Sequence, residues 1–297
     1  MNQALVMKHI EIIAATTSRA DSVLRDAFSG PGKRFIKRLF EQKRVRHNGK
    51  ALKKGDVVEQ GERILIESET ELSDVFSPVP EEAQLTIVHE SDTLLIVDKP
   101  ANVPSLPLLP GEKGTLANAL VHHNPALKHV GNDPREAGLA NRLDAGTTGL
   151  VVVAKTTETW LSLRELFSQH KITKEYITIC ESKPLGTFND SPLLNKRGLS
   201  TIDSYGLPAR TDVVSCTPHG EYWKVVCSTR TGRMHQIRAH LAALSAPLVG
   251  DVRYGAKPIK SFSRHALHGS RLMIPQGTKE LVTTSSLPDD MMRLADV

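Results

Sequence analysis

Cysteine is scarce in this sequence: among 297 residues there are three, Cys180, Cys216 and Cys227. Their number is odd, they are widely spaced, and no two of them form a Cys-x-x-Cys pair. This spacing argues against a disulfide framework and gives no sign of a zinc or redox site. We expect three reduced cysteines that contribute to packing.

Long apolar runs are also missing. No stretch approaches the roughly 20 apolar residues that a membrane-spanning helix needs, and the N-terminus lacks the basic-then-apolar pattern of a signal peptide. We therefore expect a soluble, cytoplasmic and monomeric protein with no membrane partner. A chain of 297 residues is long enough for two domains, with an ample core in the larger one.

The net charge of +5 is concentrated in one segment. Between Arg19 and Lys54 there are twelve basic and three acidic residues, so this window carries +9 and the remainder of the chain −4. Such a concentration indicates a polyanionic partner, whereas an ordinary solvated face carries both signs. The residues expected to meet phosphate groups are Lys33, Arg34, Lys37, Arg38, Lys43, Arg44 and Arg46.

The same segment has the pattern of a small α/β domain. Two short helices are predicted at 20–28 and 33–42, separated by a glycine- and proline-containing break. Asn48-Gly49 predicts a tight turn between a strand at 45–47 and a β-element at 53–67. This order resembles the S-four RNA-binding domain, named after a small-subunit ribosomal protein, over residues 17–67, and the resemblance implies that the polyanion is RNA.

Beyond an acidic, proline-bearing stretch at 68–84, which we predict to be a linker, the pattern is rich in strands. Helices are expected near 115–123, at 157–169 and from about His235. Strands are expected at 86–89, 93–98, 150–154, 174–180, 211–216, 223–228 and 265–268. This distribution predicts an α+β domain at 85–297 with a mixed, mainly antiparallel sheet.

The most informative segment of the chain surrounds one carboxylate. Asp144 follows Asn141-Arg142-Leu143 and starts a Gly/Thr turn that continues through Ala145–Gly149 to the apolar run at 150–154. A strand this apolar is predicted to be buried, so it holds the turn rigidly. A rigid Asp with a guanidinium nearby stays ionised and can act as a base or a nucleophile. Arg-Leu-Asp alone is weak evidence, since a loop Asp is more often a turn former.

Further blocks match a known family in order and spacing. They are Leu94–Pro100, Lys174–Tyr176, Thr231–Leu241, Val249–Gly255 and Arg264–His268. Together with the Asp144 turn they resemble the RluA family of RNA pseudouridine synthases over roughly residues 85–275. The resemblance implies the pseudouridine synthase fold and the isomerisation of uridine in RNA, with Asp144 as the catalytic carboxylate. It leaves open whether Asp144 attacks C1′ of the ribose or removes a proton from C2′.

The resemblance also suggests partners for Asp144 and for the target base. A carboxylate in a pocket sized for a base would take up a proton unless a basic group lay close by. Arg238 is our first choice for that group and Arg233 the second, although either could instead hold phosphate or brace structure. Tyr176 matches the tyrosine that the family places against the uracil. Arg142 is expected either to clamp the RNA backbone or to brace its own loop.

No cofactor or metal is expected. The histidines form no His-x-x-x-His pair with a supporting carboxylate, and the glycines have neither P-loop nor dinucleotide spacing. His235 is expected to contact phosphate or to pack under the catalytic loop. The chain departs from the family's usual residues at Asn102 (Gly), Asn141 (His), Thr148 (Ser) and Met234 (Thr), which bears on substrate identity and loop geometry.

We therefore expect an RNA uridine isomerase acting on large-subunit (23S) ribosomal RNA, because relatives with the appended N-terminal domain commonly do so. A tRNA pseudouridine synthase is the enzymatic alternative. A non-catalytic RNA-binding or ribosome-assembly factor is the alternative from another class, and a metal-dependent hydrolase would need the histidines to converge.

Overall fold

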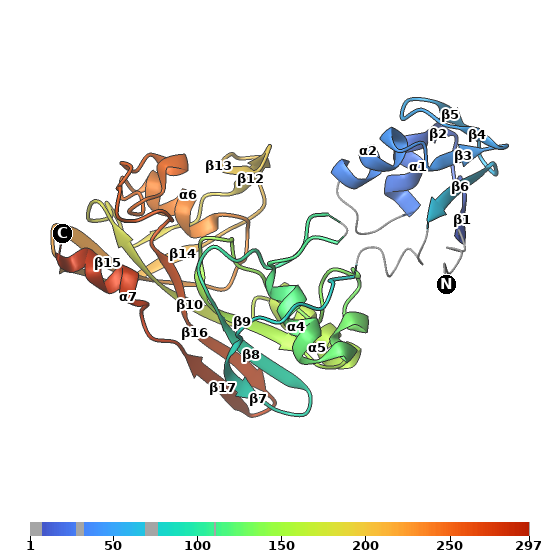
Figure 1. Ribbon diagram of the computed structural model, residues 1–297. Helices are drawn as coiled ribbons and strands as arrows, with labels where there is room; N and C mark the ends of the chain where they lie inside the picture. Colours follow the sequence, from blue (N-terminus) through green and yellow to red (C-terminus); the bar gives the residue numbers. More distant parts are fainter. Residues whose placement is uncertain (1–7, 28–32, 69–76, 110, 297) are drawn as a thin grey trace. The chain divides into compact units, whose positions relative to one another are not determined.

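The computed structural model describes residues 8–27, 33–68, 77–109 and 111–296 (Figure 1). The chain divides into two compact units. The first contains residues 1–83 and 106–138, and the second contains residues 84–105 and 139–297. The functional division expected from the sequence, with an RNA-binding domain at 17–67 and a linker at 68–84, stays a prediction, and residues 69–76 of that linker lie outside the described residues.

Two short helices and small antiparallel sheets form the N-terminal part of the first unit, as the sequence predicts. The helices are α1 (Ala20–Ala27) and α2 (Lys33–Glu41). The described strands are β1 (Lys8–Ile13), β2 (Ser18–Arg19), β3 (Val45–His47), β4 (Lys50–Ala51), β5 (Val57–Val58) and β6 (Arg63–Ser68). They pair in the order β1-β6-β3-β4, with β2 on β5. The expected turn joins β3 to β4, where Asn48 and Gly49 have φ of 48° and 75°.

Burial explains why these elements form. Ile36, Leu39 and Phe40 of α2 are buried together with Val23 and Leu24 of α1 in one apolar cluster. Apart from Ala27 at the end of α1, the described exposed residues of these helices are charged, as expected for an amphipathic helix. Strand β1 was not predicted, and the single β-element expected at 53–67 is two separate strands.

The first unit also contains α4 (Leu116–His123) and the short 3-10 helix Pro125–His129. A capping box starts α4: the hydroxyl of Thr115 accepts from the Asn118 amide, and the Asn118 side chain accepts from the Thr115 amide. The Asn118 side chain also donates to the carbonyl of Val79 at 2.8 Å. The described end of the predicted linker is therefore bound to the start of α4.

A long sheet dominates the second unit. In the described part of the chain its nine strands run in the order β11-β14-β15-β10-β16-β9-β8-β7, with β17 also paired to β16. All of its strand pairs are antiparallel except β9 with β16, so the predicted mixed, mainly antiparallel sheet is confirmed. The strands are β7 (Thr86–Glu90), β8 (Leu94–Lys99), β9 (Thr148–Ala154), β10 (Thr173–Cys180), β11 (Phe188–Asn189), β14 (Thr211–His219), β15 (Tyr222–Thr229), β16 (Leu267–Gln276) and β17 (Lys279–Thr284).

The remaining described elements of this unit surround the sheet or extend from it. Helices are α5 (Thr157–Ser168), α6 (Gln236–Ala243) and α7 (Asp289–Met292), with 3-10 turns at Val252–Tyr254 and Arg293–Asp296. A hairpin of β12 (Leu193–Lys196) and β13 (Leu199–Ile202) stands apart from the main sheet. Neither the hairpin nor β17 was predicted, and the strand expected near 265–268 is wrong in its bounds.

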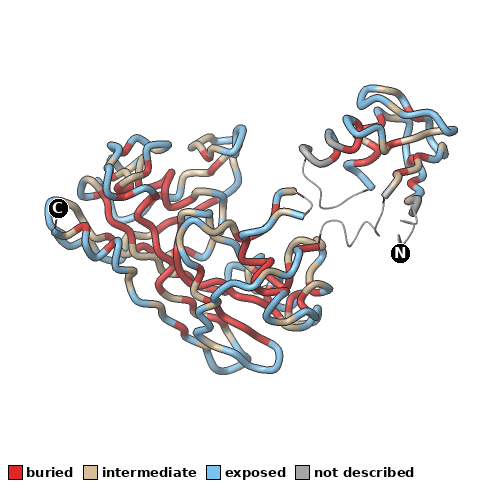
Figure 2. The backbone as a smooth tube through the Cα atoms, viewed as in Figure 1, coloured by how far each residue is buried: buried red, intermediate tan, exposed pale blue. Residues whose placement is uncertain are grey.

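Strand β9 positions the predicted site because it lies inside the sheet. Every residue from Thr148 to Ala154 is buried, and most of β8 is too (Figure 2). The turn that carries Asp144 enters this strand, so its end is anchored in the core. Among the described residues, no helix combines the length and the apolar character that crossing a membrane would require.

Candidate active site

Asp144 lies in a turn whose backbone is held from several sides. The amide of Thr147 donates to the carbonyl of Asp144 at 3.0 Å and closes the turn. Before Asp144, the hydroxyl of Ser105 donates to the Leu143 carbonyl at 2.8 Å and accepts from the Leu143 amide at 3.2 Å. The residue on the N-terminal side of the carboxylate is thus fixed by both of its backbone polar groups.

Two buried basic side chains hold the carbonyls that follow Asp144. The ammonium of Lys99, a fully buried side chain, donates to the Ala145 carbonyl at 3.1 Å. The guanidinium of Arg264 donates through Nη1 to the Gly146 carbonyl at 3.1 Å. Burial lowers the pKa of Lys99 to about 7, and the negative charge of Asp144 opposes this shift.

Two histidines hold the last residues of the turn. Nε2 of His265 lies 2.7 Å from the hydroxyl of Thr147, and Nδ1 of His268 lies 2.9 Å from that of Thr148. Burial lowers the pKa of His265 to about 3, an effect that the nearby Arg238 charge adds to, so this ring is neutral at pH 7. Side chains from elsewhere in the unit therefore contact each residue from Leu143 to Thr148.

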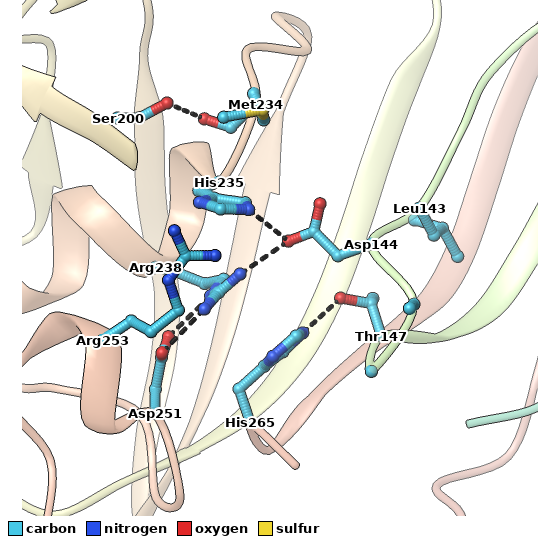
Figure 3. Close-up of polar contacts among 12 residues, drawn as sticks. Leu143, Asp144, Thr147, Ser200, Met234, His235, Arg238, Asp251, Arg253 and His265 are labelled. Carbon is cyan, nitrogen blue, oxygen red and sulfur yellow. Dashed lines mark hydrogen bonds and ion pairs between the residues drawn. The ribbon is translucent and has the colours of Figure 1, made fainter. Parts of the chain in front are cut away.

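The carboxylate of Asp144 forms an ion pair with Arg238, its first-choice partner from the sequence (Figure 3). Nη1 of Arg238 donates to Oδ2 of Asp144 at 2.9 Å. The other donors of the same guanidinium bind Asp251, with Nε at 2.6 Å from Oδ2 and Nη2 at 2.7 Å from Oδ1. One arginine thus bridges two carboxylates, and the bidentate contact with Asp251 fixes the direction of Nη1.

Burial makes this arrangement electrostatically strong. The side chains of Arg238 and Asp251 are 5% and 1% exposed, whereas that of Asp144 is 27% exposed. Although burial acts against its charge, the hydrogen bonds to Asp251 and Asp144 raise the pKa of Arg238 overall. The guanidinium also lies 5.0 Å from the centre of the Tyr254 ring. Arg238 therefore stays charged and is held on three sides.

His235 approaches the same carboxylate oxygen from the residue before α6. Its Nε2 lies 3.7 Å from Oδ2 of Asp144, and its Nδ1 lies 3.0 Å from the hydroxyl of Tyr254. Its backbone has a left-handed φ of 53°, an uncommon conformation for a residue with a side chain. Burial is the largest influence on the pKa of His235 and lowers it. The ring therefore lies beside the turn that carries Asp144.

A pocket opens in front of Asp144, and the candidate residues line it. Its walls are formed by Arg142, Leu143, Asp144, Thr147, Tyr176, Thr229, Thr231, Gly232, Arg233, His235, Gln236, Ile237, Arg238 and Leu267. Tyr176 comes from β10, and burial raises the pKa of its phenol, with Asp144 adding to the effect. The phenol therefore keeps its proton. The Asp144 carboxylate, the neutral aromatic ring and the apolar side chains of Leu143, Ile237 and Leu267 together suit a flat, uncharged ring as ligand.

The second-choice arginine has different partners. Nε of Arg233 donates to the Pro208 carbonyl at 2.9 Å, and the Arg233 amide donates to the Gln236 side chain at 3.0 Å. Among the described residues, Arg238 is the arginine that hydrogen-bonds Asp144. Arg142 is exposed at the rim of the pocket, where phosphate contact stays a prediction.

The basic residues predicted to bind RNA in the first unit differ in their surroundings. Lys37 is exposed, and its Nζ lies 3.3 Å from Oε1 of Glu41. Nε of Arg46 lies 2.5 Å from Glu67, and its Nη1 donates to the Gly49 carbonyl. Lys43 is exposed and Arg44 is half-buried. The side chains of Lys33, Arg34 and Arg38 lie outside the described residues.

The four departures from the family pattern each fit the local structure. Asn102 adopts a φ of 60°, where glycine is favoured and asparagine is tolerated. The side-chain oxygen of Asn141 accepts from the Val152 amide at 2.7 Å. Thr148 retains a hydroxyl for its contact with His268. The side chain of Met234 is exposed, and its backbone carbonyl accepts a hydrogen bond from the Ser200 hydroxyl.

Several residues of the site had no role assigned from the sequence. Lys99, Asp251, Tyr254 and Arg264 all lie within sequence blocks that match the family, but matching gives no partner. Ser105 lies outside those blocks. In the described part of the chain, no group of three or more His, Cys, Asp or Glu residues could hold a metal ion.

Comparisons with known proteins agree with this geometry. Residues 93–243 match the family model described as RNA pseudouridylate synthase. The chain is 33% identical over 300 residues to the ribosomal large subunit pseudouridine synthase D of Escherichia coli (strain K12), covering 94% of this chain and 90% of that protein. The protein of the same name from Pasteurella multocida (strain Pm70) is 33% identical over 298 residues, with the same coverage.

Solved structures share the fold. Human RNA Pseudouridylate Synthase Domain Containing 4 aligns with a TM-score of 0.56 at 22% identity, covering 71% of this chain and 92% of that chain. Human RNA Pseudouridylate Synthase Domain Containing 1 aligns with a TM-score of 0.54 at 24% identity, covering 73% of this chain and 89% of that chain. The predicted α+β pseudouridine synthase fold is confirmed.

Proposed function

This chain belongs to the RNA pseudouridylate synthase family, and on that premise we propose that it converts specific uridines of large-subunit ribosomal RNA into pseudouridine. The relatives that support this substrate are named for the ribosomal large subunit and align with nearly the whole chain. No cofactor enters the proposal, because uracil is both the leaving group and the incoming nucleophile.

The ion pair between Asp144 and Arg238 inside the pocket is the observation that carries the proposal. A charged, immobile partner fixes the orientation of the carboxylate in a site that is partly closed to water. In the part of the chain that the structure describes, the hydrogen bond and ion pairs of this carboxylate all involve Oδ2. Oδ1 is therefore the oxygen left to meet the ribose.

The proposed reaction moves one bond. The bond between ribose C1′ and uracil N1 breaks, the uracil rotates in the pocket, a bond forms between C1′ and C5, the C5 proton is released, and N1 takes up a proton from solvent. Asp144 either attacks C1′ and is later displaced, or removes a proton from C2′ and later returns it. Both routes need an ionised carboxylate held at a fixed distance from the ribose, which the clamped turn provides.

Tyr176 supports the retention of the free base. Tyr176 lines the same pocket as Asp144, where its ring can stack on the uracil once the nucleotide is extruded from the RNA. Because its phenol stays protonated, it brings no second negative charge near Asp144. Arg142 at the rim is placed to contact a neighbouring phosphate.

The N-terminal segment from Arg19 to Lys54 supports the choice of a large RNA. Its charge of +9 is the footprint of a phosphate-rich partner. We assign to it the anchoring of RNA, separate from the chemistry at Asp144.

The experiment that tests the proposal maps pseudouridines in cells with and without the gene, using carbodiimide-dependent reverse-transcription stops. We expect one or more stops to disappear from large-subunit ribosomal RNA and to return when the intact gene is restored. A gene encoding Asp144→Asn should not restore them. Loss of stops from tRNA alone would show that the substrate assignment is wrong, and no lost stops would favour a non-catalytic RNA-binding role.

A further inference from the structure

We propose that Asp290, in the C-terminal segment after β17, is a positioning residue for the isomerase site: it holds Arg264, which in turn holds the turn that carries Asp144. The inference rests on the proposed function in one respect, the catalytic role of Asp144. It concerns a residue well beyond the matched family region at 93–243.

Arg264 connects the C-terminal segment to the catalytic turn. Its side chain is 3% exposed, and its Nη1 donates to the Gly146 carbonyl at 3.1 Å. The same nitrogen lies within hydrogen-bonding distance of the carbonyls of His265 and Leu267, at 3.3 and 3.4 Å. Carbonyls fix the end of the guanidinium but do not neutralise its charge.

Asp290 is the carboxylate that neutralises the charge of the Arg264 guanidinium. Its oxygens accept from Nε of Arg264 at 2.7 Å and from Nη2 at 2.8 Å, so the contact is bidentate. The ring of Phe262 lies 5.2 Å from the guanidinium carbon. With Nε and Nη2 bound to Asp290, only Nη1 is directed at Gly146. The geometry at Gly146 therefore depends on Asp290.

A second contact joins the same segment to the turn. The carbonyl of Ser285 lies 3.4 Å from Nε2 of His268, whose Nδ1 lies 2.9 Å from the Thr148 hydroxyl. The Ser285 hydroxyl also donates to Asp98, in β8. The C-terminal segment is thus connected to Gly146 through Arg264 and to Thr148 through His268, both on the C-terminal side of Asp144.

Exposure makes Asp290 a selective point to perturb. Its side chain is 45% exposed, so replacing it opens no cavity in the core. Asp290→Asn retains an oxygen for the backbone amide of Met291 and removes the charge that pairs with Arg264. Asp289→Asn is the matched control, because Asp289 is an exposed acid in the same turn of α7.

Hydrogen exchange of the full-length protein tests the clamp without RNA. The Thr147 amide is protected by its bond to the Asp144 carbonyl, so a peptide covering the turn reports its opening. We expect Asp290→Asn to speed exchange there about tenfold, as loss of a charge-assisted contact implies, while a peptide from β15 is unchanged. Asp289→Asn should match the parent, and Asp290→Glu should restore slow exchange. Unchanged exchange of the turn in Asp290→Asn overturns the proposal.

Single-turnover rates at saturating RNA test the consequence for activity. Asp290→Asn should lower the rate about tenfold with RNA affinity within about twofold of the parent, because the residue acts on the turn and not on RNA. Faster exchange with an unchanged rate would overturn the positioning role. If the parent itself isomerises no ribosomal uridine, the proposed function fails, and the exchange result still decides whether Asp290 holds the turn.

Discussion

Arg238 is expected to be irreplaceable by lysine, although the charge would be conserved. The arginine directs two donors at Asp251 and one at Asp144, at distances of 2.6 to 2.9 Å. A lysine ammonium is a compact charge on a flexible stem and cannot serve both carboxylates with this geometry. Asp251 is 1% exposed and Asp144 is 27% exposed. The ammonium should therefore stay with Asp251, where an unpaired charge would cost more.

The magnitude follows from the contact that Asp144 loses. A charge-assisted hydrogen bond contributes about 1.5–3 kcal/mol. Because that contact orients the carboxylate for the reaction, its loss should lower turnover roughly tenfold to a hundredfold. Stability should change much less than in Arg238→Ala, which would leave Asp251 buried without a counter-ion and cost about 3–5 kcal/mol.

The assay is release of tritium from RNA that contains 5-tritiated uridine, measured in single turnover at saturating enzyme. Arg233→Lys is the matched control, because Arg233 lines the same pocket but donates to the Pro208 carbonyl. It should stay within about threefold of the parent, as expected for loss of an exposed contact. A near-normal rate for Arg238→Lys would refute the argument, and a greater loss in Arg233→Lys would show that the wrong arginine was chosen.

Tyr176→Leu should lower the single-turnover rate strongly while the melting temperature stays close to that of the parent, since leucine fills space but cannot stack like an aromatic ring; a rate equal to the parent's would remove the stacking role. The pKa of His265 is about 3 in the folded protein and about 6.5 in the unfolded chain. As the pH decreases from 6.5 towards 3, the unfolded chain therefore binds a proton at this ring that the folded protein does not, and the stability of the fold decreases. In urea unfolding, His265 should lower the free energy of unfolding of the parent by about 1.4 kcal/mol when the pH is changed from 7.5 to 5.5, and His265→Asn should lack this contribution. An equal pH dependence of the free energy of unfolding in both proteins would contradict this role of His265. Replacing the four basic residues in Lys33–Arg38 by glutamine should weaken RNA binding and flatten its salt dependence, whereas an unchanged salt slope would make the basic segment a solvated surface.

Elements with a strong local signal were predictable from the sequence. The strand containing Leu150–Ala154 is buried on both faces, so its residues form a continuous apolar run. The β12–β13 hairpin was missed because its turn is Arg197-Gly198, with φ of 53° and 82°, in place of the usual Asn-Gly. Strand β16 was misplaced because its first residue, Leu267, is followed by His268, Gly269 and Ser270, which give no apolar alternation.

The candidate site, like the fold, could be predicted from the sequence only in part. Asp144 and Arg238 could be chosen because they stand in recognisable motifs and have complementary chemistry. The residues that hold them could not be paired from sequence, since their contacts join distant segments: Lys99 to Ala145, and Arg264 to both Gly146 and Asp290. Their function depends on three-dimensional packing, which no local pattern records.

The central claim is that the Asp144 carboxylate performs the isomerisation, and Asp144→Asn tests it most directly. Asparagine is nearly isosteric and can still accept the hydrogen bond from Arg238, so the variant should fold and bind RNA like the parent. Tritium release from 5-tritiated uridine in large-subunit ribosomal RNA should fall to the background without enzyme. Substantial release by folded Asp144→Asn would contradict the account, because the reaction would then proceed without the carboxylate.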